Sequence, residues 1–147
     1  MKRILLTLIS ALLLSTVAFA QKGLNCYPVF QGKIVPWKNM IVTEARGHTI
    51  SEYRLSYYRG VSFKASDELA AKVASLVEQD AARALVKESE KVEGLLTYAL
   101  VQPKSEGSIN RYVCYQARKL EDGWMLTLMY LEGPATLDDL KNMFEKQ

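Results

Sequence analysis

The stretch GWMLTLMYLEGPATLDDLKNMF, residues 123–144, decides the fold of this chain. Residues 124–131 are apolar at almost every position, so an extended strand here is apolar on both faces, because its side chains alternate sides. A strand apolar on both faces is usually covered on both faces, which predicts a central place in a sheet. Gly133-Pro134 ends the strand, and residues 136–144 predict a short helix with one apolar side.

The segments before this stretch predict an antiparallel sheet. Asp122-Gly123 is a hairpin signal that joins the last strand to the one before it. In the segment from Tyr53 to Phe63, apolar and aromatic side chains fall on odd positions, which is typical of a strand with one buried face. Gly60 interrupts this alternation and suggests a bulge. Strands are expected, in chain order, at residues 39–46, 53–63, 95–102, 109–118 and 124–131.

A helix is predicted to begin after Ser66, a good N-cap residue that two acidic residues follow. From Asp80 onward, charged residues occupy positions of the stripe that should be apolar, so the helix should end within residues 79–82. Residues 83–90 fit either a further strand, which is preferred, or a charged continuation of the helix. The expected fold is therefore an α+β domain: an antiparallel sheet of five to six strands with two helices packed on it.

The first 20 residues have the layout of a cleaved secretory signal. Lys2 and Arg3 precede an apolar run over residues 4–19, and Ala18-Phe19-Ala20 predicts a cut after Ala20. No later segment of the sequence is long and apolar enough to span a bilayer. We therefore expect a periplasmic or secreted protein.

After the signal, residues 21–37 predict an extended N-terminal arm that packs on a single domain formed by residues 38–147. Pro28, Gly32 and Pro36 interrupt the arm, which excludes a long helix or a central strand there. Removal of the signal takes two positive charges and no negative one, so the formal net charge falls from +3 to +1. A nearly neutral chain with mixed signs has no electrostatic footprint for nucleic acid.

Two cysteines, Cys26 and Cys114, leave two interpretations open. An exported protein with one cysteine pair can form a disulfide, which here would close most of the domain into one loop. The alternative is two separate buried thiols that behave as small apolar side chains.

The sequence carries no recognisable catalytic, cofactor or metal motif, so no residue is assigned to any of these roles. His48 is the only histidine, which excludes a metal site or a catalytic scheme built on two histidines. The glycines form neither a phosphate-binding loop nor a nucleophile elbow. The paired carboxylates fit solvated faces, turns and helix starts better than catalysis. They stand at Glu88/Glu90, Glu121/Asp122 and Asp138/Asp139.

Tyrosines on the expected strands, together with arginines near them, suggest a surface for binding carbohydrate or protein. Ordinary strand composition is the alternative explanation. The residues of this candidate surface are Tyr58, Tyr112, Arg54, Arg59 and Arg111.

The sequence resembles a family of small exported proteins of unknown function from Bacteroidetes. The resemblance rests on QKGLNCYPVFQGK, EYRLSYYRGVSF, NRYVCYQ and LTLMYLEGPATLDDLKNMF, and it covers nearly all of the mature chain. It implies an envelope or secreted location and carries no catalytic residue.

We therefore expect a non-enzymatic module that binds a protein or a cell-envelope component. Two alternatives are a small enzyme or enzyme inhibitor that uses scattered carboxylates, cysteines and His48, and a carrier of a small apolar ligand. A closed cleft around His48 would favour the enzyme, whereas an open strand edge would favour binding by strand addition.

Overall fold

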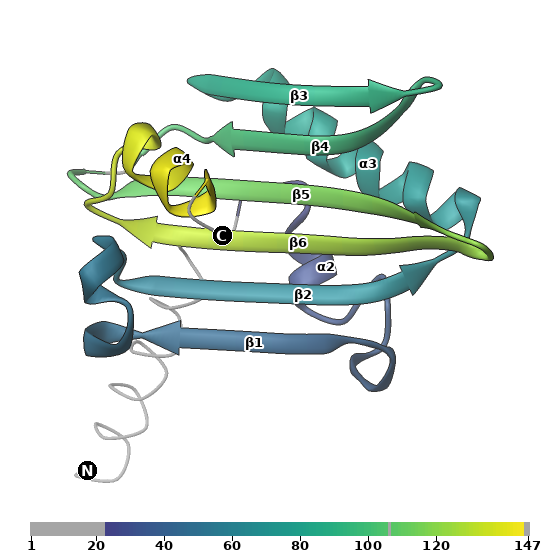
Figure 1. Cartoon of the computed structure of the whole chain (residues 1–147), viewed down its shortest axis with the longest axis horizontal. Coiled ribbons are helices and arrows are strands. Elements are labelled where there is room, and N and C mark those ends of the chain that lie inside the picture. Colours follow the sequence, from purple (N-terminus) through teal and green to yellow (C-terminus); the bar gives the residue numbers. More distant parts are fainter. Residues whose placement is uncertain (1–22, 106, 146–147) are drawn as a thin grey trace, which may run out of the picture.

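A computed structural model describes residues 23–105 and 107–145 of the chain. Six strands form one antiparallel sheet in the order β1-β2-β6-β5-β4-β3, with helices on both faces (Figure 1). The main elements are β1 (Ile41–Arg46), β2 (Tyr57–Ala65), α3 (Asp67–Ala82), β3 (Val86–Val92), β4 (Leu95–Gln102), β5 (Asn110–Leu120), β6 (Gly123–Gly133) and α4 (Leu137–Glu145). The expected α+β class and antiparallel sheet are confirmed.

Strand β6 lies at the centre of the sheet, as its apolar sequence predicts. It pairs with β2 on one edge and with β5 on the other along nearly its whole length. Leu126 and Leu128 point into a core shared with α3, while Leu131 points into a second core under α4. All three side chains are buried. The centre of the sheet therefore needs cover on both faces.

Helix α3 begins and ends where the sequence predicts. The Ser66 hydroxyl accepts a hydrogen bond from the Leu69 N–H at 3.2 Å, and the last helical residue is Ala82. The strand interpretation of the next segment is also confirmed, because β3 covers Val86–Val92. Asp80, however, is on the buried stripe of the helix rather than out of phase with it.

Asp80 is buried because its carboxylate binds the start of the N-terminal arm. Its oxygens accept hydrogen bonds from the backbone N–H of Asn25 at 2.6 Å and of Cys26 at 3.0 Å. The Asn25 side-chain amide donates a third, at 3.1 Å. A buried carboxylate is stable only when it is paired in this way. The polar residue that interrupts the apolar stripe of α3 thus contacts the N-terminal arm, 55 positions earlier in the chain.

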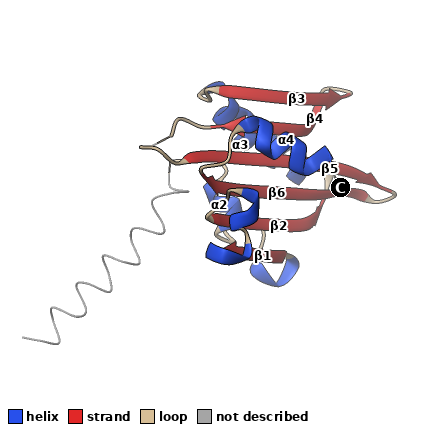
Figure 2. Ribbon diagram, turned by 60° about the vertical axis from the view of Figure 1, so that its left-hand side comes forward, coloured by secondary structure: helices blue, strands red, loops and turns tan. Residues whose placement is uncertain are grey.

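The arm packs on the sheet, but its predicted extended conformation is wrong. It holds helix α2 (Tyr27–Phe30) and a 3-10 turn, η1 (Trp37–Asn39). Pro28 suits the first turn of a helix, where its missing N–H has no role. Val29 and Phe30 are buried, and α2 covers the β6–β2 side of the face on which α3 covers β4 (Figures 1 and 2).

The predicted strand over residues 53–63 begins later than expected. Ser51–Tyr53 forms the 3-10 turn η3, and β2 starts at Tyr57. The bulge expected at Gly60 is absent, since the β2–β6 register runs through it without a shift. The Tyr58 phenol lies over Gly60, and a Cβ at residue 60 would come within 2.4 Å of the Tyr58 hydroxyl oxygen, so a larger residue there would displace the Tyr58 ring.

The predicted signal over residues 1–20 and its cut after Ala20 lie outside the described residues. Within the two described ranges, no helix has both the length and the apolar character that a membrane crossing requires.

The Asp80 contacts predict a measurable cost when the arm is released. Asp80→Ala should lower the free energy of unfolding by about 2–4 kcal/mol, because two backbone donors lose a charged acceptor. Urea unfolding of the purified protein measures this. Asp80→Asn is the matched control and should cost less, since it keeps one acceptor oxygen. A cost for Asp80→Ala below about 0.5 kcal/mol, as for surface substitutions, would contradict the role given to this contact.

Candidate functional site

The residues of the candidate surface suggested by the sequence do not lie together. Tyr112 is fully buried, and its hydroxyl donates a hydrogen bond to the Ala135 carbonyl at 2.7 Å. Tyr58 is half-buried on the same face of the sheet. Tyr112 is therefore a core residue, and its assignment to a binding surface is wrong. The physical reason is that α4 covers this end of the sheet (Figure 1).

Arg54 is exposed but has a structural partner. Its guanidinium forms an ion pair with Asp139 at 3.0 Å, and its backbone carbonyl accepts a hydrogen bond from the Ala135 N–H at 2.8 Å. Asp139 and Thr136 cap each other's backbone N–H groups at the start of α4. The Thr136 backbone N–H, helped by its hydroxyl and by Arg54, holds the pKa of Asp139 below its usual value. Asp139 thus serves the helix start, as the sequence predicts.

Arg59 and Arg111 lie on the opposite face, with α2 and α3. Arg111 is opposite Glu132 in the β5–β6 register, beside the Tyr130 hydroxyl that donates to Glu132 at 2.7 Å. Burial raises the pKa of Tyr130, and the Arg111 charge opposes that rise. The five predicted residues are therefore divided between two faces of the sheet and cannot form one surface.

The two cysteines are separate buried thiols in this structure. Cys26 belongs to the core under α3, and Cys114 belongs to the core under α4. The sheet lies between them, because the even-numbered position of Cys114 on β5 points away from α3. Burial raises the pKa of both thiols, that of Cys114 to about 12. The disulfide interpretation is therefore corrected in favour of its alternative.

The groups that an enzyme would need lie apart. His48 is exposed in the 3-10 turn η2 (Gly47–Thr49), whereas both cysteines are buried in the two cores. Among the described residues, no three His, Cys, Asp or Glu side chains are grouped to hold a metal ion.

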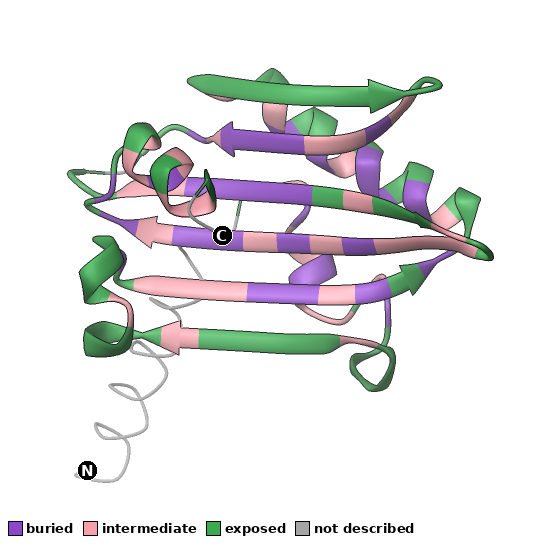
Figure 3. Cartoon of the chain, viewed as in Figure 1, coloured by how far each residue is buried: buried purple, intermediate pink, exposed green. Residues whose placement is uncertain are grey.

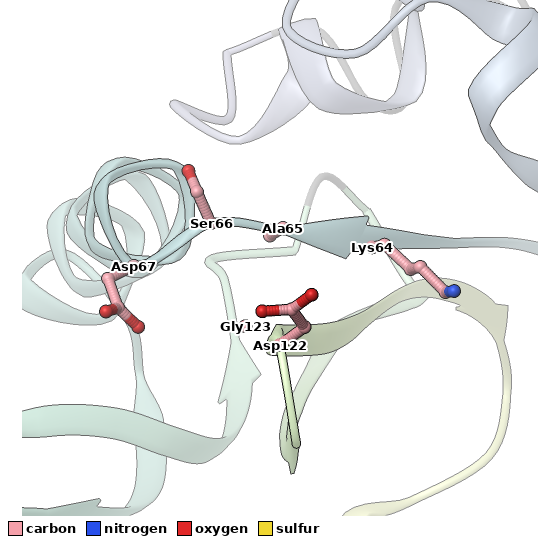
Figure 4. Close-up of a pocket in the computed structure, with 6 residues that line it drawn as sticks. All are labelled: Lys64, Ala65, Ser66, Asp67, Asp122 and Gly123. Atoms are coloured by element: carbon pink, nitrogen blue, oxygen red, sulfur yellow. The ribbon is translucent and has the colours of Figure 1, made fainter.

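A shallow, open hollow of about 440 Å³ lies where β2 meets α3, next to the β5–β6 turn (Figure 4). Lys64, Asp67 and Asp122 extend around it from three different elements. Asp67 is already engaged, since it accepts a hydrogen bond from the Trp124 indole N–H at 2.8 Å. The hollow has charged walls, which do not suit the apolar ligand of the carrier hypothesis.

The outer edge of β1 is one of the two open edges of the described sheet. Gly47 continues the β1–β2 register, and its N–H donates to the Ser56 carbonyl at 3.2 Å. Because antiparallel residues bond to a given neighbour at every second position, the odd-numbered residues of β1 bond to β2. The backbone N–H and C=O groups of Val42, Glu44 and Arg46 therefore point outward. No described strand pairs with them.

The two edges of the sheet differ in how they are protected. Both edge strands are exposed (Figure 3), but β3 has the sequence VKESEKV, with four charged side chains in seven residues. Charges of this density hinder the pairing of an edge with another strand. Exposed valines stand at both ends of β3 as well, but β1 has only two charged side chains, Glu44 and Arg46, and they lie on one face. Its first residues, Ile41 and Val42, are 72% and 40% exposed. The β1 edge therefore lacks the protection that β3 has.

An arginine–aromatic cluster lies beside the β1 edge on the α2–α3 face. We use this name for Trp37, Glu44, Arg46, Tyr57 and Arg59. The Glu44 carboxylate contacts Arg46 at 2.9 Å and Arg59 at 3.7 Å. The Arg46 guanidinium lies 4.9 Å from the centre of the Tyr57 ring, and that of Arg59 lies 5.3 Å from the Trp37 ring. Cation–π contacts at these distances hold both arginines in place.

Of the five residues in this cluster, only Arg59 was predicted from the sequence to lie on a binding surface. The Trp37 side chain is 47% exposed, although the sequence favours its packing as part of the arm. Gly32 supplies the space for it, because a Cβ there would come within 2.6 Å of the indole ring. The available signal was the alternation Val42, Glu44, Arg46, which places an acid and a base on one face of an edge strand.

Comparison with known families places the chain in one of them. The family described as "Family of unknown function (DUF6108)" matches residues 13–144. The chain belongs to this family. A search of curated proteins finds no match. The matched residues include the central strand, both cores and the β1 edge.

Two tyrosines of β5 predict opposite responses to loss of the hydroxyl. Tyr112→Phe should cost about 0.5–1.5 kcal/mol, because the bond to Ala135 is lost. Tyr115 is also fully buried, but its hydroxyl has no hydrogen-bond partner among the described residues. Tyr115→Phe should therefore leave stability unchanged or raise it by up to about 1 kcal/mol. Chemical unfolding of both variants compares them, and an equal loss in the two would contradict these assignments.

Proposed function

We propose that the mature chain is an exported, non-enzymatic module that binds a partner protein by taking up an extended segment along the edge of β1. The partner is a periplasmic, secreted or cell-envelope protein. In this mode the backbone of the added segment bonds to the edge strand, and side-chain neighbours on the two faces supply specificity.

The observation that carries this proposal is the difference between the two edges. The outward backbone groups of Val42, Glu44 and Arg46 have no described strand beside them, and apolar side chains begin that strand. An exposed apolar edge strand favours pairing with another chain unless something protects it. The other edge, β3, has such protection in its two lysines and two glutamates, which lie within five consecutive residues.

Binding is preferred to catalysis because of where the reactive groups lie. The exposed aromatic ring of Trp37 and the arginines of the cluster gather beside the β1 edge. His48 and the two thiols are distributed among a turn and two separate cores. An exported location is supported by the signal-like start of the sequence and by its resemblance to small exported proteins from Bacteroidetes.

The edge hypothesis predicts that one backbone N–H controls partner binding. Val42→Pro removes an outward donor and no bond to β2, so the fold should persist while partner capture is lost. Val42→Ala is the matched control: it keeps the backbone N–H that Val42→Pro removes, so partner capture should be retained. Tagged mature proteins would be compared in capture from the native envelope. A protein retained equally by the wild type and by Val42→Pro would contradict β1 edge binding.

Export has its own test. Expression of the full chain in a bacterial host with a secretory system should release a product that begins at Gln21, measurable by intact-mass analysis of the extracellular and periplasmic fractions. A product that retains residues 1–20 in the cytoplasm would contradict the proposed location. Ala18→Arg, which places a large charged side chain in the small-residue cleavage site, should block processing and serves as the control.

A further inference from the structure

The arginine–aromatic cluster carries an excess positive charge. Its one carboxylate, that of Glu44, faces both Arg46 and Arg59. The Arg59 contact, at 3.7 Å, is longer than a hydrogen bond. Among the described residues, the Arg59 Nε also has no hydrogen-bond partner. One carboxylate therefore serves two guanidinium groups, and the cluster can accept a second acid.

The position of Arg46 makes it the arginine that an added strand reaches. Its backbone groups point outward at the edge, and its side chain is 53% exposed, against 24% for Arg59. In a strand added along β1, the residue opposite Arg46 lies on the same face of the sheet, with Cβ atoms about 4.5–5.5 Å apart. An Asp or Glu at that position reaches the Arg46 guanidinium without displacing Glu44.

The neighbours on β1 determine the rest of the segment. On the opposite face the edge presents Ile41, Thr43 and Ala45, none of which is charged. Such neighbours favour β-branched side chains at the alternate positions of a paired strand. A basic residue opposite Arg46 would instead place like charges side by side, which is unfavourable.

From this charge complementarity we propose that the β1 edge selects an extended acidic segment of a partner protein, with Asp or Glu opposite Arg46 and β-branched residues at the alternate positions. The inference rests on the proposed edge-binding function and specifies the chemistry of its ligand. It assigns Arg46 as a specificity residue.

A set of synthetic peptides tests the proposal directly. Each is a seven-residue, fluorescein-labelled peptide of alternating threonine and valine, with a single Asp placed at each position in turn to sample every register. Parallel sets carry Asn or Lys in place of Asp. Fluorescence anisotropy with the mature wild-type protein should show at least one Asp peptide that binds about tenfold more tightly than its Lys counterpart, with Asn between them. The preference should weaken as salt concentration rises.

Charge reversal separates this inference from the proposed function. Arg46→Glu should invert the preference, so that the Lys peptide binds more tightly than the Asp peptide. Arg118→Glu makes the same change in net charge on an exposed residue of β5, and should leave the preference intact. Peptides that bind without regard to charge, yet are lost in Val42→Pro, would overturn the acidic specificity and leave edge binding standing. Binding that survives Val42→Pro, or no binding by any peptide at millimolar concentration, would overturn the inference.

Discussion

Strand β6 imposes the constraint on which the rest of this structure depends. It is hydrogen-bonded to a neighbouring strand on each edge and is apolar on each face. It is therefore stable only when four neighbouring elements pack against it. Two are the strands β2 and β5. The others are the α2–α3 layer on one face and α4 on the other. At nine residues, α4 is too short to be stable by itself and depends on this docking in return.

The two faces are covered by different means, and this explains the role of Asp80. The α2–α3 layer combines a long helix from the middle of the chain with the N-terminal arm, and neither covers the whole sheet alone (Figures 1 and 2). The Asp80 carboxylate joins them through the backbone of Asn25 and Cys26. A polar contact inside an apolar layer fixes where the arm sits, because a displaced arm would leave a buried charge unpaired.

An open six-stranded sheet has two edge strands, and in this protein they differ in the number and placement of their charged side chains. Strand β3 has four charged side chains among its seven residues, and two of them form ion pairs with the helices: Lys91 with Glu78, and Glu88 with Lys141. Strand β1 keeps its charges on one face, where Glu44 and the arginines contact each other. The aromatic rings of the cluster contact those arginines on the same face, next to the edge strand. The open backbone edge and the charged cluster thus lie at the same place, which is why we propose binding at β1.

The sequence by itself determined the elements whose signals are local. Alternation with period two identified β2, the Ser66 cap identified the start of α3, and apolarity on both faces identified β6 as central. Only the tertiary structure decided which distant residues meet. The separation of Cys26 from Cys114, the burial of Tyr112 under α4 and the pairing of Asp80 with the arm each depend on contacts across many positions of the chain. The identity of the two edge strands also depends on the tertiary structure. The sequence indicates where strands form, whereas hydrogen-bond pairing between them determines which strands lie at the edges of the sheet.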